Sequence, residues 1–157
     1  MIVGSRWATS DDIADLVGMY PAFEAEQGAL RAMWPLADGI AAPVADSLRA
    51  AIEDNEILVG VGTIDDIVFG FIHVTVDDLL PQADGVRVGV IRHIYVEPDA
   101  RGVGVAESMI GLALDELRAR GITRFDARVS PGHRNAKNFF EANGFSARLI
   151  VMHNPGP

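Results

Sequence analysis

Residues 96–106 combine the residue types that could bind a phosphate group. The stretch reads Val96-Glu97-Pro98-Asp99-Ala100-Arg101-Gly102-Val103-Gly104-Val105-Ala106, and an apolar segment with helical spacing follows it over residues 104–120. The first backbone N–H groups of a helix have no partner within the helix, and the helix dipole favours negative charge there. Gly102 and Gly104 carry no Cβ and leave room for a phosphate, while Arg101 can add a charge-assisted contact. The spacing therefore predicts an anion site at this turn.

The same residues resemble a known family, the GNAT N-acetyltransferases. Arg101-Gly102-Val103-Gly104-Val105-Ala106 resembles the family's (Gln/Arg)-x-x-Gly-x-(Gly/Ala) signature, and Ile94-Tyr95-Val96-Glu97-Pro98 resembles its fourth strand. Ala136-Lys137-Asn138-Phe139-Phe140-Glu141-Ala142-Asn143-Gly144-Phe145 resembles its second signature, a helix that ends in Gly-Phe. The specific match covers about residues 88–145. The resemblance implies transfer of an acetyl group from acetyl-CoA to a primary amine, directly and in a ternary complex.

The resemblance also implies which residues hold acetyl-CoA. In the family this loop binds the pyrophosphate through backbone N–H groups, and the pantetheine arm lies along strand four. The Val96 amide is then expected to polarise the thioester carbonyl, and such backbone donors contribute about 3 kcal/mol each. His133 stands where the family often has an asparagine that contacts the cofactor. The expected cofactor-binding residues are Ile94, Val96, Arg101, Gly102, Val103, Gly104, Val105, Ala106, His133, Ala136 and Phe140.

Two other interpretations fit parts of the loop sequence. Glycines and an arginine between a strand and a helix could form an ordinary tight turn. The dinucleotide fingerprint G-x-G-x-x-G also begins correctly, which would indicate a nucleotide-binding oxidoreductase. However, Glu107 stands in the place of its third glycine, and the preceding loop contains Pro98. The downstream match favours the acetyltransferase over both.

The general base is harder to assign than the loop. Many family members carry acidic residues just before the aromatic residue of strand four, where this chain has Arg92 and His93. A histidine can accept a proton near neutral pH, so we expect His93 to take the amine proton, directly or through water. A hydrogen-bonded structural role for His93 is the alternative, and His73 is a second candidate base. Strand alternation predicts one face with Ile91, His93 and Tyr95, and the other with Arg92, Ile94 and Val96.

The general acid is where the sequence departs from the family. A tyrosine often stands five residues before the phenylalanine of Gly-Phe, but this chain has Phe140, which cannot donate a proton. A thiol pKa of about 8.5 makes the thiolate a tolerable leaving group without an acid. Tyr95, Ser130, His133 or water remain as alternative donors. The departures leave open a second function, a non-catalytic module that binds or senses acyl-CoA.

Acceptor contacts in this family come from the first helices and the loop between strands three and four. That implies substrate-binding roles for residues that combine aromatic, acidic and imidazole side chains. This mixture suits an amine with an apolar body, whereas Arg92 would suit an acceptor that carries a carboxylate. The expected residues are Phe23, Glu24, Glu26, Trp34 and His73, with Asp77 or Asp78.

Composition narrows the class of protein. The chain has 157 residues, 49% of them hydrophobic, which is enough for a single domain over 1–157 with its own core. A net charge of −9 argues against nucleic-acid binding, and no apolar run is long enough to span a membrane. The absence of cysteine excludes disulfides and favours a cytoplasmic protein without a thiolate metal site. The resemblance allows a homodimer. The basic residues after 123 include at least one expected cofactor contact: Arg124, Arg128, Arg134, Lys137 and Arg148.

The elements that must position these residues follow in order. Strands are expected at 2–8, 57–63, 67–76, 86–96, 122–129 and 145–153, with a polar loop at 77–85. Helices are expected from Thr9 or Ser10 to an interruption or kink at Pro21, from Pro43, over 104–120 with Gly121 as C-cap, and before Gly144. Residues 22–42 mix helical and breaking signals. The order β-α-α-β-β-β-α-β-α-β predicts an α/β fold with a mixed, mostly antiparallel sheet flanked by helices, as in the GNAT family.

Overall fold

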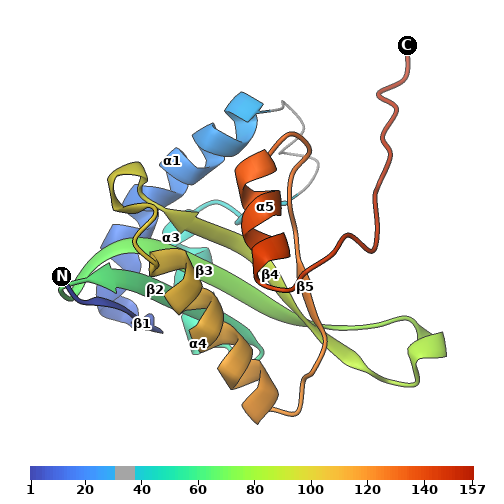
Figure 1. Ribbon diagram of the computed structural model, residues 1–157, viewed down its shortest axis with the longest axis horizontal. Helices are drawn as coiled ribbons and strands as arrows, with labels where there is room; N and C mark the ends of the chain where they lie inside the picture. The colour runs from blue at the N-terminus through green and yellow to red at the C-terminus, as the bar shows by residue number, and fades with distance from the viewer. Residues whose placement is uncertain (31–37) are drawn as a thin grey trace.

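A mixed β-sheet runs through the protein (Figure 1). The computed structural model describes residues 1–30 and 38–157, so Trp34 lies outside the described residues. In this part of the chain five strands pair in the order β1-β2-β3-β4-β5, antiparallel except for β4 with β5. The strands are β1 Val3–Trp7, β2 Ile57–Ile64, β3 Ile67–Asp78, β4 Arg87–Val96 and β5 Phe125–Ala127. The predicted α/β class with a mostly antiparallel sheet is confirmed.

Helices cover both faces of the sheet (Figure 1). On one face α1 (Ile13–Leu30) and α3 (Val44–Glu53) bury side chains against Val59, Val61 and Phe71. On the other face α4 (Val105–Ala119) and α5 (Arg134–Ala142) pack on Ile72, Val74 and Ile91. A Cβ at Gly62 would stand 2.5 Å from the Val105 side chain, so this glycine lets α4 approach the sheet closely. Three short 3-10 turns complete the described elements: η1 Ser10–Asp12, η2 Pro81–Ala83 and η3 Pro98–Ala100.

The first helix begins as predicted but does not stop at Pro21. Thr9 and Asp12 form a capping box, and the Asp12 carboxylate also receives two hydrogen bonds from Arg6. Pro21 lies inside α1, although a proline in a helix interior costs about 3 kcal/mol. Burial of Tyr20, Phe23 and other apolar side chains on the same helix offsets that cost. Of the two predicted alternatives, the interruption is wrong, because tertiary packing overrides the local signal, and the kink stays a prediction.

The C-terminal segment differs most from its prediction. α4 ends as expected, with Gly121 N–H donating to Arg118 C=O and Ile122 N–H to Leu117 C=O. However, only residues 125–127 of the predicted strand 122–129 pair with the sheet. The predicted last strand, 145–153, is absent from the structure, and Leu149 to Met152 are 72–87% exposed. Apolar, β-branched residues favour a strand, but they form one only where a neighbouring edge pairs with them.

A β-bulge in β4 changes the faces of its side chains. His93 pairs with His73, whereas the next pair joins Ile91 to Val74, so Arg92 is the extra residue. Ile91 consequently packs in the cluster against α4, while the His93 and Tyr95 rings contact Phe23 of α1. The predicted simple alternation, with Ile91, His93 and Tyr95 on one face, was wrong at this point.

Candidate active site

The loop between β4 and α4 presents a set of unpaired backbone donors. Gly102 and Gly104 adopt φ values of 79° and 99°, which residues with a Cβ rarely adopt. A Cβ built on either would meet no atom within 4 Å, so the loop surface is open there. Within the described part of the chain, no backbone N–H of residues 102–106 has a hydrogen-bond acceptor. Donors that converge at a helix start suit a diphosphate.

The adjacent end of β4 offers unpaired main chain. Glu97 N–H donates to Phe69 C=O at 2.8 Å, which makes Val96 and Gly70 a non-hydrogen-bonded pair. The N–H and C=O of Val96, and by the two-residue period those of Ile94, therefore point away from β3. Pairing between β4 and β5 ends at Ile91, whose C=O accepts from Arg128 N–H at 3.0 Å. The N–H groups of Ile94 and Val96 can thus bond to an extended ligand.

Arg101 connects this strand end to α1. Its Nε donates to Val96 C=O at 2.8 Å, and its Nη2 contacts Glu26 Oε2 at 2.6 Å. Its guanidinium also lies 5.6 Å from the centre of the Tyr95 ring. Because Nε and Nη2 bind groups on different elements, Arg101 links the end of β4 to α1 in this conformation. Its expected contact with the cofactor stays a prediction.

His133 brings the start of α5 to the same place. Its Nε2 lies 3.8 Å from Glu26 Oε1, and its Nδ1 lies 3.3 Å from Gln27 Nε2. Burial lowers the pKa of His133, with Glu26 opposing the shift, so the imidazole is uncharged near neutral pH. We call the residues that meet here the Glu26 cluster: Glu26, Gln27, Tyr95, Arg101 and His133.

Tyr95 lies under this cluster and keeps its proton. The residue is 6% exposed and packs against Phe23 and Phe71. Burial, together with the Glu26 carboxylate, raises the pKa of Tyr95. The phenol is therefore protonated at neutral pH, as a proton donor must be. Its predicted role as an acid stays untested.

A second polar cluster lies at the bulge and is centred on Asp38. The Asp38 carboxylate, 2% exposed, receives two hydrogen bonds from Arg92 at 2.6 and 3.0 Å. Arg128 Nη1, at 3.3 Å, and Gly39 N–H, at 2.8 Å, also contact it. His93 Nε2 lies 3.6 Å from Asp38, and His93 Nδ1 lies 2.9 Å from His73 Nδ1. We call Asp38, His73, Arg92, His93 and Arg128 the Asp38 cluster.

The electrostatics of the Asp38 cluster fix its charges. Burial alone would raise the pKa of Asp38, but hydrogen bonds from His93, Arg92 and Gly39 outweigh it and hold the pKa far below its usual range. Burial, with the positive charge of Arg92, lowers the pKa of His73 to about 3. A carboxylate that seldom protonates and an imidazole that seldom becomes charged are both weak bases.

The predicted base and acceptor residues lie in different surroundings, and their roles stay predictions. His93 is 1% exposed and enclosed by the Tyr20 and Phe23 rings, so this geometry gives an amine no direct route to it. Phe23, predicted to bind substrate, is 3% exposed and belongs to the core. Glu24 lies on the exposed side of α1. Burial, together with the neighbouring Glu24 carboxylate, raises the pKa of Tyr20 to about 12. His73 is partly exposed, and its contact with substrate stays a prediction.

Residues on the second signature take structural positions. Phe140 is 4% exposed and packs edge-on against Phe139 and Phe145. Several basic residues expected near the cofactor are paired with acids instead: Lys137 with Glu141, Arg148 with Asp126, and Arg128 with Asp38. Asp38 and Gln27 were missed by sequence reasoning, because neither belongs to a local motif.

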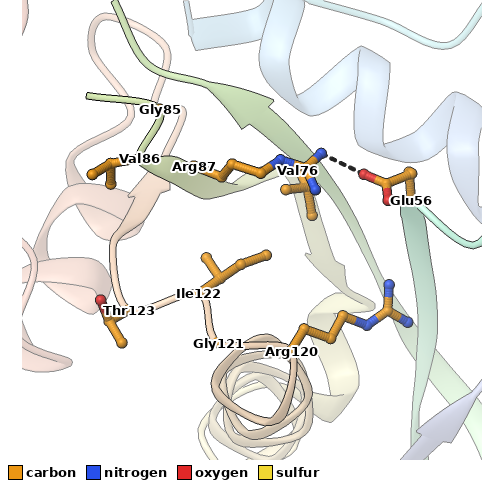
Figure 2. A pocket seen from close by; sticks show the side chains of 9 residues that line it. All are labelled: Glu56, Val76, Gly85, Val86, Arg87, Arg120, Gly121, Ile122 and Thr123. Atoms are coloured by element: carbon orange, nitrogen blue, oxygen red, sulfur yellow. Dashed lines mark hydrogen bonds and ion pairs between the residues drawn. The ribbon is translucent and has the colours of Figure 1, made fainter. Parts of the chain in front are cut away.

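A hollow of about 490 Å³ lies at the other end of α4 (Figure 2). Gly121, Ile122 and Thr123 line one side, and Val76, Gly85 and Val86 line the other. Its two arginines are already engaged: Arg87 with Glu56, and Arg120 with Glu116. The hollow therefore offers less to an anionic ligand than the loop 102–106 does.

The described residues contain neither a candidate membrane span nor a candidate metal site. Over residues 1–30 and 38–157, no helix is both long and apolar enough to cross a membrane. The same part of the chain contains no group of three or more His, Asp or Glu side chains placed to hold a metal ion.

Comparison with known proteins places these features in a family. Residues 19–145 match the Acetyltransferase (GNAT) family. A mycothiol acetyltransferase from Beutenbergia cavernae is 34% identical over 65 residues, which are 41% of this chain and 21% of that protein. The chain thus matches about a fifth of the length of the curated relatives.

Solved structures share the fold. A tetramutant of the BH1408 protein from Bacillus halodurans has a TM-score of 0.80 at 17% identity, with 99% of each chain covered. A predicted acetyltransferase from Clostridium acetobutylicum, solved with acetyl-CoA, has a TM-score of 0.72 at 17% identity, covering 98% of this chain and 96% of that one. At such identities the likeness extends to the fold alone.

Proposed function

Because the chain belongs to the GNAT acetyltransferase family, we propose that it transfers an acetyl group from acetyl-CoA to a primary amine. The observation that carries this proposal is the juxtaposition of two unpaired donor sets. The loop 102–106 presents backbone N–H groups to an anion, and the end of β4 presents the N–H groups of Ile94 and Val96. The first set suits a diphosphate and the second an extended amide-bearing arm.

Different groups of residues would have different roles in this reaction. Residues 102–106 would hold the diphosphate, and the main chain at Ile94 would align the arm. The Val96 N–H would polarise the thioester carbonyl, which makes the carbonyl carbon more open to attack. Tyr95, protonated at neutral pH, is available to the departing sulfur. Ala136, Phe140 and His133 would flank the cofactor from α5 and its start.

We place the acceptor among small-molecule amines rather than protein amines. The name of the curated relatives, mycothiol acetyltransferase, supports a small-molecule acceptor. The position of α1, whose Glu24 and Glu26 lie on or near the surface, suits a positively charged amine. Direct transfer in a ternary complex is part of this proposal, and it is compatible with a sequence that contains no cysteine to form an acyl-thioester intermediate.

An amine panel tests the proposal. Purified protein is incubated with acetyl-CoA and single amines, and release of the coenzyme A thiol is followed. Saturable release that depends on both substrates, with lines that intersect in double-reciprocal plots, is the expected result. Binding of acetyl-CoA without acetylation of any amine would instead favour the non-catalytic acyl-CoA-binding module. That second function is favoured by Phe140 in place of the acid and by the enclosure of His93.

A further inference from the structure

Resting on the proposed function, we infer that Glu26 is the group that accepts the proton of the acceptor amine. Strand four carries no acid at the bulge, where Arg92 and His93 stand. Glu26, on α1, instead lies near the end of this strand, where it contacts Arg101. The base of this protein is thus supplied by a helix rather than by the strand.

The position of Glu26 follows from its contacts. Arg101 Nη2 holds Oε2 at 2.6 Å, and Arg101 Nε holds Val96 C=O at 2.8 Å. One guanidinium group therefore separates the Glu26 carboxylate from the main chain that would bind the thioester. A planar, two-sided donor fixes both distance and orientation, as a base that meets its proton in one geometry requires.

One oxygen of Glu26 stays available for the amine. Oε1 lies 3.8 Å from His133 Nε2, which is beyond hydrogen-bond distance, so its lone pairs can accept a proton. The side chain is 29% exposed, so an amine can approach it. His133 is uncharged near neutral pH and does not neutralise the carboxylate.

The other titratable groups near the strand end are less suitable. Asp38 is 2% exposed and its carboxylate is engaged by two arginines, His93 and a backbone N–H. The His93 side chain is fully buried, and His73 is held uncharged by burial and by the charge of Arg92. Glu97 also directly follows Val96 and is partly exposed, but within the described residues Glu26 is the one of these two acids whose carboxylate is held by an arginine.

The proposed step balances as follows. Glu26 takes one proton from the acceptor ammonium, and the neutral nitrogen attacks the thioester carbon to form the C–N bond. The carbonyl electron pair moves to oxygen beside the Val96 N–H and returns as the C–S bond breaks. The second nitrogen proton goes to the leaving thiolate, and Glu26 then releases its proton to solvent. The products are the N-acetylated amine, coenzyme A and one proton.

The test compares Glu26→Gln, Glu26→Asp and a control, Glu53→Gln, which changes an exposed glutamate at the end of α3, away from both clusters. Benzylamine serves as the acceptor probe because it joins a primary amine to an apolar body. We expect kcat with Glu26→Gln to fall by about 10²-fold and the acidic limb of the pH profile of kcat/KM to vanish. Glu26→Asp should retain that limb, and Glu53→Gln should match the wild type.

Acetyl-CoA binding, measured by calorimetry, separates the possible failures. If Glu26 acts only in proton transfer, the Kd of acetyl-CoA for Glu26→Gln should stay within about twofold of the wild-type value. Unchanged kcat, a retained acidic limb, or a loss that appears only as weaker acetyl-CoA binding would each overturn the assignment of Glu26. If the wild type binds no acetyl-CoA, or acetylates neither benzylamine nor any panel amine, the proposed function fails instead.

Discussion

The Asp38 cluster and the Glu26 cluster are both built on a carboxylate held by arginine, yet they suit different tasks. Asp38 is 2% exposed and receives contacts from Arg92, Arg128, His93 and Gly39. Glu26 is 29% exposed and has one short contact, with Arg101. A saturated, buried carboxylate holds elements together, whereas a positioned and partly exposed one can exchange a proton. The difference supports a structural role for the bulge of β4 and is consistent with the proposal that places the chemistry at the end of that strand.

The largest difference between the two clusters is expected when each carboxylate is replaced by an amide. Asp38→Asn leaves Arg92 and Arg128, which are 29% and 46% exposed, facing a neutral group, so the free energy of unfolding should fall by about 2–3 kcal/mol. Glu26→Gln removes a partly exposed pair and should cost about 1 kcal/mol or less. Chemical denaturation of both variants measures the two values. Equal losses would mean that the clusters do not differ in the way described.

The pH dependence of stability should separate the clusters next. The pKa of His73 in the folded protein, about 3, lies below its ordinary value of 6.5. The unfolded chain therefore takes up the proton first, so the stabilisation is complete above pH 6.5 and is lost as the pH falls towards 3. Denaturation between these pH values should show a slope that His73→Asn reduces. His133→Asn, in the other cluster, should leave most of the slope; the reverse pattern would contradict the assignment.

Arg101→Met should show whether Arg101 positions Glu26 or binds the diphosphate of acetyl-CoA. If Arg101 positions Glu26, turnover should fall by about tenfold while the Kd of acetyl-CoA changes by less than about threefold. If Arg101 instead binds the diphosphate directly, the Kd should rise more than kcat falls. Calorimetry and steady-state kinetics on one preparation distinguish these results.

The smallest effect is expected far from both clusters, in the exposed tail. Ile150→Thr and Val151→Thr change side chains that are 75% and 82% exposed, so each should alter the free energy of unfolding by less than about 0.5 kcal/mol. Thermal unfolding measures this. A loss above about 1 kcal/mol would mean that the segment pairs with the sheet after all, as its sequence predicts.

Features that depend only on residues adjacent in the sequence could be predicted from it. The loop 102–106 is a strand, a turn and a helix start in succession, so Gly102 and Gly104 could be interpreted from their spacing alone. The Gly121 cap is local in the same sense. Gly102, Gly104 and Gly121 all adopt the left-handed backbone that such turns require.

Contacts between distant residues escaped prediction. Asp38 meets Arg92 and Arg128 across 54 and 90 residues, and no spacing within one segment encodes such a meeting. The bulge at Arg92 reversed the expected faces because one extra residue breaks the two-residue period. Glu26 was expected near the acceptor, but its contact with Arg101 appears only when α1 packs beside β4.

The central claim is that residues 102–106 and the end of β4 together bind acetyl-CoA. Calorimetric titration of the wild type, Gly104→Val and the control Gly111→Ala tests it most directly. A side chain at φ 99° is strained by about 1–2 kcal/mol and would project into the open loop surface, whereas Gly111 lies inside α4 with no atom within 4 Å of a Cβ. We predict one saturable site in the wild type, binding at least about tenfold weaker in Gly104→Val, and no change in Gly111→Ala. No heat with the wild type, or equal affinity in Gly104→Val, would contradict the account.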